Sequence, residues 1–249
     1  MTASAPGSAV GERVRAEERA SELVPEPARD PRRVALGAFR LAIAATEVVA
    51  LIGNFTYVLG FRLFATVNFF SYFTVLSAML AVVTLLVAAW YAILRPRDPV
   101  FLGVFRTMVT VYLVVSGIVF GLIVAQASSV DYRVDVPWSD TLLHFVVPAL
   151  ALIAWTVDAV IAVNPPVPWA TVGWVLVIPT IWLVYTLLRG ADVGWYPYFF
   201  LDETQVGGFP GVIGYCAVVL AIFVAVTAVL VAVHRGFARR AVRRADATA

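Results

Sequence analysis

Six long apolar stretches, separated by short polar or proline-containing breaks, dominate the chain. Each has about the 20 residues that a helix needs to cross roughly 30 Å of hydrocarbon. Backbone exposed to lipid must satisfy its own hydrogen bonds, so these stretches are helices rather than strands. The sequence therefore predicts an all-α polytopic integral membrane protein, a six-transmembrane-helix bundle, with spans at about 35–59, 69–94, 101–126, 141–163, 169–188 and 211–233.

The polar ends of the chain fall outside these spans. Residues 1–35 are rich in Ala, Glu, Arg and Pro and hold few large apolar side chains, which predicts a disordered cytoplasmic tail. Residues 36–235 form the predicted six-helix transmembrane domain, and residues 236–249 a basic cytoplasmic tail. The first residues lack the pattern of a signal peptide.

Composition excludes several classes of protein. The chain is 61% hydrophobic and 14% charged, with a mean hydropathy of +0.89, whereas a soluble domain carries about 25% charged residues. This excludes a soluble globular enzyme, and a net charge of +2 is too small to indicate a nucleic-acid partner. All 18 basic residues are arginine; this usage is typical of a GC-rich bacterial genome, so we expect a bacterial plasma membrane protein.

Arginines near the span ends predict the orientation, because cytoplasmic flanks of membrane helices are enriched in basic residues. Three regions are rich in arginine: the N-terminal flank, the 95–106 region and the C-terminal tail. The remaining loops carry one arginine each, Arg62, Arg133 and Arg189, and two of these loops are acidic, around Asp131 and Asp135 and around Asp202. Both termini are therefore predicted to be cytoplasmic.

Charged residues inside spans need a partner or a function, since each costs about 2.5–3.5 kcal/mol at mid-membrane. Glu47 lies near the middle of the first span, with Arg40 and Asn54 seven residues away on either side. Glu47 is either a buried structural carboxyl group or a proton or ligand site. Asp158 lies near the cytoplasmic end of the fourth span, where we expect it to reach interfacial water.

The second span opens with a hydroxyl-bearing stripe. Ser71, Thr74 and Ser77 recur at helical spacing, and Tyr72 lies among them. Such stripes are commonly helix-packing faces. The alternative is that Thr74 serves as a nucleophile with the other hydroxyl groups in support.

His144 is the one histidine within a span and follows Asp140 by one helical turn. At that spacing the Asp140 carboxylate can accept the imidazole N–H and fix its tautomer. His144 is either a satisfied core histidine or a general base. Thr74 and His144 fall about 9 and 5 Å below the same membrane boundary at 1.5 Å per residue, so their depths are compatible with one shared site.

The loop before the last span carries a run of aromatic residues. Trp195 and Tyr196 belong to this run. Trp and Tyr favour the headgroup region of a bilayer, so the run predicts an aromatic belt. The alternative is a lid that binds substrate over a cavity between the helices.

Together these residues resemble a known family. Tyr72-Phe73-Thr74, Asp140-x-x-x-His144-x-x-x-Pro148 and Trp195-Tyr196-Pro197 occur in the order found in the androgen-induced protein family of six-span membrane proteins, particularly its bacterial branch. The resemblance covers about residues 36–235. It implies hydrolysis of fatty acid esters of hydroxy fatty acids, with Thr74 as nucleophile and His144 as its catalytic partner. Family members commonly place an Asn after the threonine, where this chain has Ser77-Ala78.

The sequence thus predicts an intramembrane hydrolase of fatty acyl esters with a Thr nucleophile and a His base. Its substrate would be a membrane lipid or a lipid-like molecule. The alternatives are a non-catalytic membrane binding or transport protein, and a structural partner in a membrane complex. No cofactor is expected, and no metal site, because His144 has no second His or Cys nearby.

Overall fold

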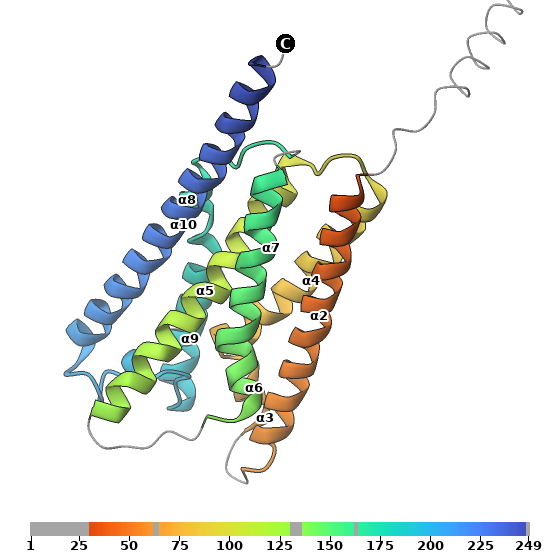
Figure 1. The fold of residues 1–249 in the computed structure, drawn as a ribbon. Helices are drawn as coiled ribbons and strands as arrows, with labels where there is room; N and C mark the ends of the chain where they lie inside the picture. Colours follow the sequence, from red (N-terminus) through yellow and green to blue (C-terminus); the bar gives the residue numbers. More distant parts are fainter. Residues whose placement is uncertain (1–29, 62–64, 130–135, 162–163, 248–249) are drawn as a thin grey trace, which may run out of the picture.

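The computed structural model describes residues 30–61, 65–129, 136–161 and 164–247, and every regular element in these ranges is a helix (Figure 1). Six of these helical segments are long and apolar enough to cross a membrane. The predicted all-α, six-span bundle is confirmed. Its elements are α2 (Pro31–Val58), α3 (Thr66–Phe69), α4 (Phe73–Leu94), α5 (Val100–Ser129), α6 (Trp138–Thr141), η1 (Leu142–Val146), α7 (Val147–Ile161), α8 (Thr171–Trp174), α9 (Val177–Val193), η2 (Phe199–Leu201) and α10 (Phe209–Asp246).

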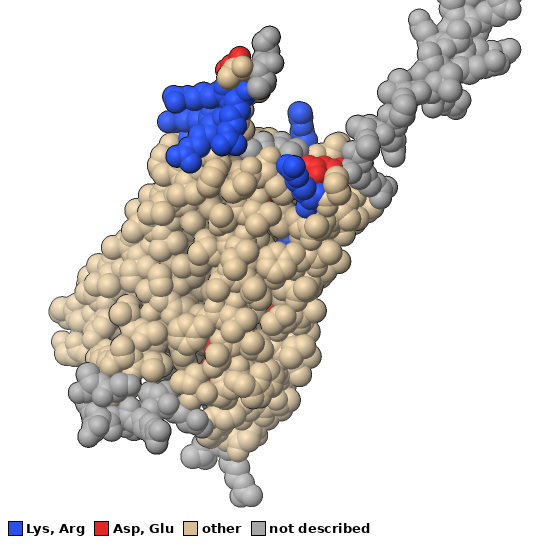
Figure 2. Space-filling view, viewed as in Figure 1, with Lys and Arg blue, Asp and Glu red and all other residues tan. Residues whose placement is uncertain are grey.

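The bundle has two distinct ends. The start of α2 and the end of α10 lie at one end, which we call the terminal end (Figure 1). Helix α3, the start of α4, α6 and the start of α10 lie at the other, which we call the site end. Basic side chains gather at the terminal end, and most of the face below them is uncharged (Figure 2). The loop residues Arg62, Asp131, Arg133 and Asp135 lie outside the described residues.

The helical part of the chain is longer than predicted at both termini. Helix α2 starts at Pro31, within the predicted tail, because the Asp30 side chain accepts a hydrogen bond from the Arg32 N–H at 2.9 Å. Proline is well suited to the first helical turn, where its missing N–H has no acceptor. Helix α10 runs to Asp246, through most of the predicted 236–249 tail. Residues 1–29 lie outside the described residues.

Small residues hold the centre of the bundle together. Ala50, Ala78, Ala88 and Ala89 are fully buried where α2 and α4 pack against each other, because small side chains allow membrane helices to approach closely. A larger aromatic and aliphatic core fills the space between α4, α5, α7 and α10. Fewer residues of α9 and α10 are buried than of the other four spans, so these two helices pack more loosely on the bundle.

Candidate functional site

Thr74 lies in the first turn of α4, where the helix leaves a backbone donor free. The second span starts at Phe73 rather than at residue 69, because Thr66–Phe69 forms the separate helix α3 and Tyr72 is extended. The first N–H groups of a helix have no acceptor within it. The Thr74 N–H donates instead to the Tyr198 hydroxyl oxygen, at 3.4 Å.

His144 lies in a π-helical turn that Pro148 explains. A helical carbonyl normally accepts from the N–H four residues later, but a proline at that position has none. The His144 carbonyl therefore lacks the usual donor four residues later, and the Val147 N–H bonds five residues back to the Leu142 carbonyl. Such π-helical turns frequently occur at functional sites. The His144 carbonyl lies against Gly117 of α5, where a Cβ atom would collide with it.

Thr74 and His144 lie within hydrogen-bonding distance of each other. Thr74 Oγ1 is 3.3 Å from His144 Nε2, and His144 Nδ1 is 3.0 Å from the Asp140 backbone oxygen. A carbonyl oxygen can only accept, so Nδ1 carries the proton and the Nε2 lone pair faces the Thr74 hydroxyl. The imidazole also stacks on Phe120, with ring centroids 3.8 Å apart. The imidazole is thereby oriented to accept the Thr74 proton.

The predicted role of the Asp140 carboxylate is wrong. Its nearer oxygen is 3.9 Å from His144 Nδ1, beyond hydrogen-bonding distance, and it accepts instead from Asn54 Nδ2 at 2.5 Å. The π-helical turn begins directly after α6, and it leaves the backbone carbonyl of Asp140 as the acceptor for the imidazole. Asp140 therefore orients His144 through its main chain.

Two further hydroxyl groups complete the cluster. Ser116 Oγ of α5 lies 2.8 Å from Thr74 Oγ1, and the Tyr198 hydroxyl lies 3.4 Å from the same atom. Because Thr74 donates to His144, Ser116 is the donor in its bond to Thr74. Sequence reasoning missed both residues. Ser116 could have been found as half of a Ser-Gly pair within an apolar span. Tyr198 could have been found as the third aromatic residue in the loop that holds Trp195 and Tyr196.

Both tyrosines near the cluster stay protonated at neutral pH. Burial raises the pKa of Tyr198, and burial raises the pKa of Tyr72 to about 12. The two rings pack edge to face at 5.7 Å between centroids. Tyr198 therefore presents a neutral O–H donor to the surroundings of Thr74.

Two cavities meet at the cluster. One, of about 130 Å³, lies between α5, α9 and α10 and is lined almost entirely by apolar side chains. The other, of about 290 Å³, reaches the polar groups of Asn54, Tyr72 and Asp140. The cavities share five lining residues: Thr74, Phe120, Ile123, His144 and Tyr198. A cavity of this size that reaches polar groups can hold several waters, whereas the more apolar cavity suits hydrocarbon.

The other hydroxyl residues of the predicted stripe have structural contacts. Ser77 donates to the Thr74 carbonyl at 2.9 Å, which fixes the first turn of α4. Ser71 lies before the helix and donates to the Val67 carbonyl at 3.4 Å. Of Ser71, Ser77 and Tyr72, only Tyr72 lines one of the two cavities.

Trp195 and Tyr196, predicted to bind substrate, lie outside both cavities. The Trp195 ring packs edge to face against Tyr72 and beneath the Arg189 guanidinium. Tyr196 packs against Gly190, where a Cβ atom would collide with its ring. The aromatic residue of this loop that reaches the site is Tyr198.

Glu47 is fully buried, and neither carboxyl oxygen has a hydrogen-bond partner among the described residues. The two polar residues that lie seven positions away from it have other partners, Asp158 for Arg40 and Asp140 for Asn54. Glu47 lines neither cavity. It is therefore separate from the Thr74–His144 cluster.

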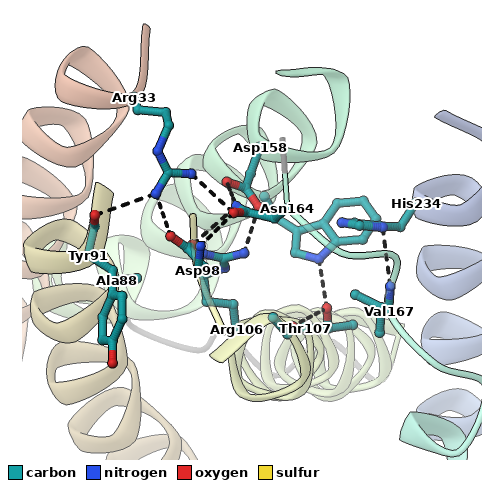
Figure 3. A network of polar contacts seen from close by, with 12 residues as sticks. Arg33, Ala88, Tyr91, Asp98, Arg106, Thr107, Asp158, Asn164, Val167 and His234 are labelled. Atoms are coloured by element: carbon teal, nitrogen blue, oxygen red, sulfur yellow. Dashed lines mark hydrogen bonds and ion pairs between the residues drawn. The ribbon is translucent and has the colours of Figure 1, made fainter. Parts of the chain in front are cut away.

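A second buried polar group lies at the terminal end (Figure 3). Arg33 pairs with Asp98 at 2.6 Å, Arg106 pairs with Asp98 and at 2.7 Å with Asp158, and Arg40 pairs with Asp158 at 3.1 Å. Asn164 binds both carboxylates and Arg33. We call these six residues the ion-pair cluster. The expectation that Asp158 reaches interfacial water is wrong, because Asp158 is only 5% exposed.

No cluster of three or more His, Cys, Asp or Glu side chains that could hold a metal ion occurs among the described residues. No family model, curated protein or solved structure matches the chain.

Proposed function

We propose that this integral membrane protein hydrolyses fatty acyl esters, with Thr74 as nucleophile and His144 as general base. The observation that carries the proposal is the 3.3 Å approach of Thr74 Oγ1 to the unprotonated Nε2 of His144. A hydroxyl group next to an oriented base is the usual arrangement of an activated nucleophile. Membership of the androgen-induced protein family, which the sequence motifs suggest, is part of the proposal.

In the first half-reaction, Thr74 Oγ attacks the ester carbonyl carbon and its proton passes to His144 Nε2. The carbonyl oxygen becomes an oxyanion, which collapses to an acyl-threonine as the bond to the alcohol oxygen breaks. The alcohol leaves with the proton from Nε2. The Asp140 carbonyl holds Nδ1–H throughout, so the same ring nitrogen accepts and returns the proton.

The oxyanion has two donors nearby. The Thr74 backbone N–H donates to the Tyr198 hydroxyl at 3.4 Å, next to the nucleophilic oxygen, and both groups would exchange this bond for bonds to the oxyanion. The Thr74 N–H belongs to the start of a 22-residue helix, where the helix dipole favours negative charge. Each donor of this kind contributes about 10²–10³ to the rate of acyl transfer.

The two cavities suit the two parts of such a substrate. The apolar cavity between α5, α9 and α10 fits an acyl chain, which could enter from lipid where α9 and α10 pack loosely. The cavity next to Asn54 and Asp140 fits the alcohol, and afterwards the water that hydrolyses the acyl-threonine. In that second half-reaction water gives its proton to His144 Nε2, the acid leaves, and Thr74 recovers its proton.

The proposed setting is a bacterial plasma membrane with both termini in the cytoplasm. The arginines at the terminal end support this orientation under the positive-inside rule. The Thr74–His144 cluster then lies toward the external leaflet.

One observation favours a non-catalytic lipid-binding protein as the second candidate. Thr74 Oγ1 already has three partners, in Ser116, His144 and Tyr198, so its hydroxyl could serve only to close an apolar cavity. In that case Thr74→Ala leaves lipid binding intact and no ester is turned over.

The test is covalent labelling of the purified protein in micelles with a fluorophosphonate, together with turnover of a p-nitrophenyl ester of a medium-chain fatty acid. Thr74→Ala is expected to abolish labelling and turnover. Thr180→Ala is the matched control, because Thr180 lines the apolar cavity but makes no side-chain bond to the cluster. Labelling that persists unchanged in Thr74→Ala would show that another residue is the nucleophile.

A further inference from the structure

The end of α10 is rich in arginine. Arg235, Arg239 and Arg243 follow one another at helical spacing, and none forms an ion pair with a carboxylate in the described parts of the chain. The arginines of the ion-pair cluster differ, since Arg33, Arg40 and Arg106 all pair with Asp98 or Asp158.

These three arginines line one cavity. Its volume is about 360 Å³, and its walls are Pro166, Arg235, Ala238, Arg239, Val242 and Arg243. Three positive charges and three apolar groups therefore face the same space. That combination fits a ligand with a negatively charged head and an apolar body.

The cavity is held open by fixed contacts. Arg235 Nη1 donates to the Val167 carbonyl at 3.3 Å, and the Val167 N–H donates to His234 Nδ1 at 3.4 Å. These bonds tie α10 to the loop that contains Pro166. Arg235 Nε is buried and has no acceptor among the described residues, so the site retains an unused donor.

The height of the cavity matches a lipid headgroup. Helix α10 has 38 residues, about 57 Å at 1.5 Å per residue, whereas the hydrocarbon core is about 30 Å thick. The apolar part of the helix ends near His234, so the backbones of Arg235 and Arg239 fall within roughly 8 Å beyond it and that of Arg243 at roughly 14 Å. The basic side chains lie at the terminal end, next to the mostly uncharged face of the bundle (Figure 2).

We propose that this cavity binds the phosphate headgroup of an anionic phospholipid, held by Arg235, Arg239 and Arg243. Guanidinium groups form paired hydrogen bonds with phosphate oxygens. Ala238 and Val242 would then contact the glycerol backbone and the upper acyl chain of the same lipid. The site lies at the opposite end of the bundle from Thr74 and His144, so it does not depend on the proposed hydrolase.

The experiment titrates the intact protein in neutral detergent micelles with dioleoylphosphatidylglycerol and counts bound lipids by native mass spectrometry. Binding is expected to be at least tenfold tighter than that of dioleoylphosphatidylcholine. Arg239→Gln and Arg243→Gln should each weaken binding about fivefold, which corresponds to about 1 kcal/mol per charge. Arg240→Gln is the matched control, because it removes the same charge from the same helix outside the cavity, and it should change binding less than twofold.

Three results would overturn the proposal. Equal losses in Arg240→Gln and Arg239→Gln would mean diffuse charge attraction without a site. Equal binding of the two lipids would mean that negative charge is not recognised. Displacement of the lipid by millimolar inorganic phosphate, or by a short single-stranded RNA at the lipid's own concentration, would identify a different occupant.

Discussion

The molecule buries two polar clusters of opposite character. The ion-pair cluster at the terminal end consists of three arginines paired with two aspartates, with Asn164 between the two carboxylates. The Thr74–His144 cluster consists of uncharged hydroxyl groups and an imidazole, and it borders two cavities. The charged cluster has its partners within the protein, whereas the uncharged one faces space that a ligand can fill.

This difference predicts a structural role for the ion-pair cluster and, under the proposed function, a chemical role for the Thr74–His144 cluster. The ion-pair cluster joins residues of α2, α5 and α7 with the loops at 95–99 and 164–168, so it fixes the helices relative to one another. Removing one member leaves a buried charge unpaired, which costs much more than removing a neutral hydroxyl group. Substitutions in the ion-pair cluster should therefore change mainly the free energy of unfolding, and substitutions in the Thr74–His144 cluster mainly ester turnover.

The largest effect is expected from His144→Gln on ester turnover. If His144 is the base of the proposed reaction, its loss should lower kcat/KM by at least about 10³-fold, as in hydrolases with an activated hydroxyl group. The free energy of unfolding should fall little, because His144 carries no ion pair within hydrogen-bonding distance. Turnover in micelles and a denaturing-detergent titration measure the two quantities. Turnover within tenfold of the wild type would remove His144 from the reaction.

Asp158→Asn is expected to lower the free energy of unfolding rather than to act directly on ester turnover. Arg40 and Arg106 would each lose a carboxylate partner, and breaking a buried pair in this way costs about 3–5 kcal/mol. Denaturing-detergent titration measures the loss, and Asp192→Asn on the exposed end of α9 is the control, expected to stay within about 0.5 kcal/mol. If Asp158→Asn unfolds no more readily than the control, the ion-pair cluster does not hold the helices together.

A smaller effect is expected from Gly117→Ala. The new methyl group would collide with the His144 carbonyl, so α5 and η1 must separate and Ser116 and His144 must shift relative to Thr74. A displacement near 1 Å can cost about 10²-fold in rate. Gly121→Ala is the matched control one turn along α5, because its Cβ would meet only Phe145 at 3.9 Å. Equal turnover in both variants would mean that the close approach of α5 does not position the site.

The fold could be predicted from sequence because the bilayer imposes it. Span length and hydropathy determine six helices, and the predicted ends lie within a few residues of the observed ones for most spans. The main differences have local causes. Asp30 and Pro31 start α2 early, and an arginine-rich helix replaces the predicted C-terminal tail because nothing after His234 interrupts it before Asp246.

The site could be predicted only in part. The depth of a residue in the membrane follows from its position along the span, so the sequence predicted that Thr74 and His144 lie at similar depths. The angle at which helices face one another does not follow from residue number, so Ser116 and Tyr198 were missed. The π-helical turn caused by Pro148 also shifts the periodicity of the fourth span. For that reason the spacing of Asp140 and His144 indicated the Asp140 carboxylate as the acceptor for the imidazole, whereas the acceptor is the Asp140 backbone carbonyl.

The smallest effect is expected from Asp140→Asn. The imidazole tautomer depends on the backbone carbonyl at 3.0 Å, which this substitution preserves, and the new amide oxygen can still accept from Asn54. Loss of tautomer control costs about 10⁴-fold in triad enzymes, so a decrease in kcat/KM of tenfold or less would indicate that the carbonyl provides this control. A decrease as large as that of His144→Gln would instead assign it to the carboxylate 3.9 Å from Nδ1. Orientation by the main chain would allow the protein to position a neutral base without placing a second ionised group beside an apolar cavity, where an unpaired charge is most costly.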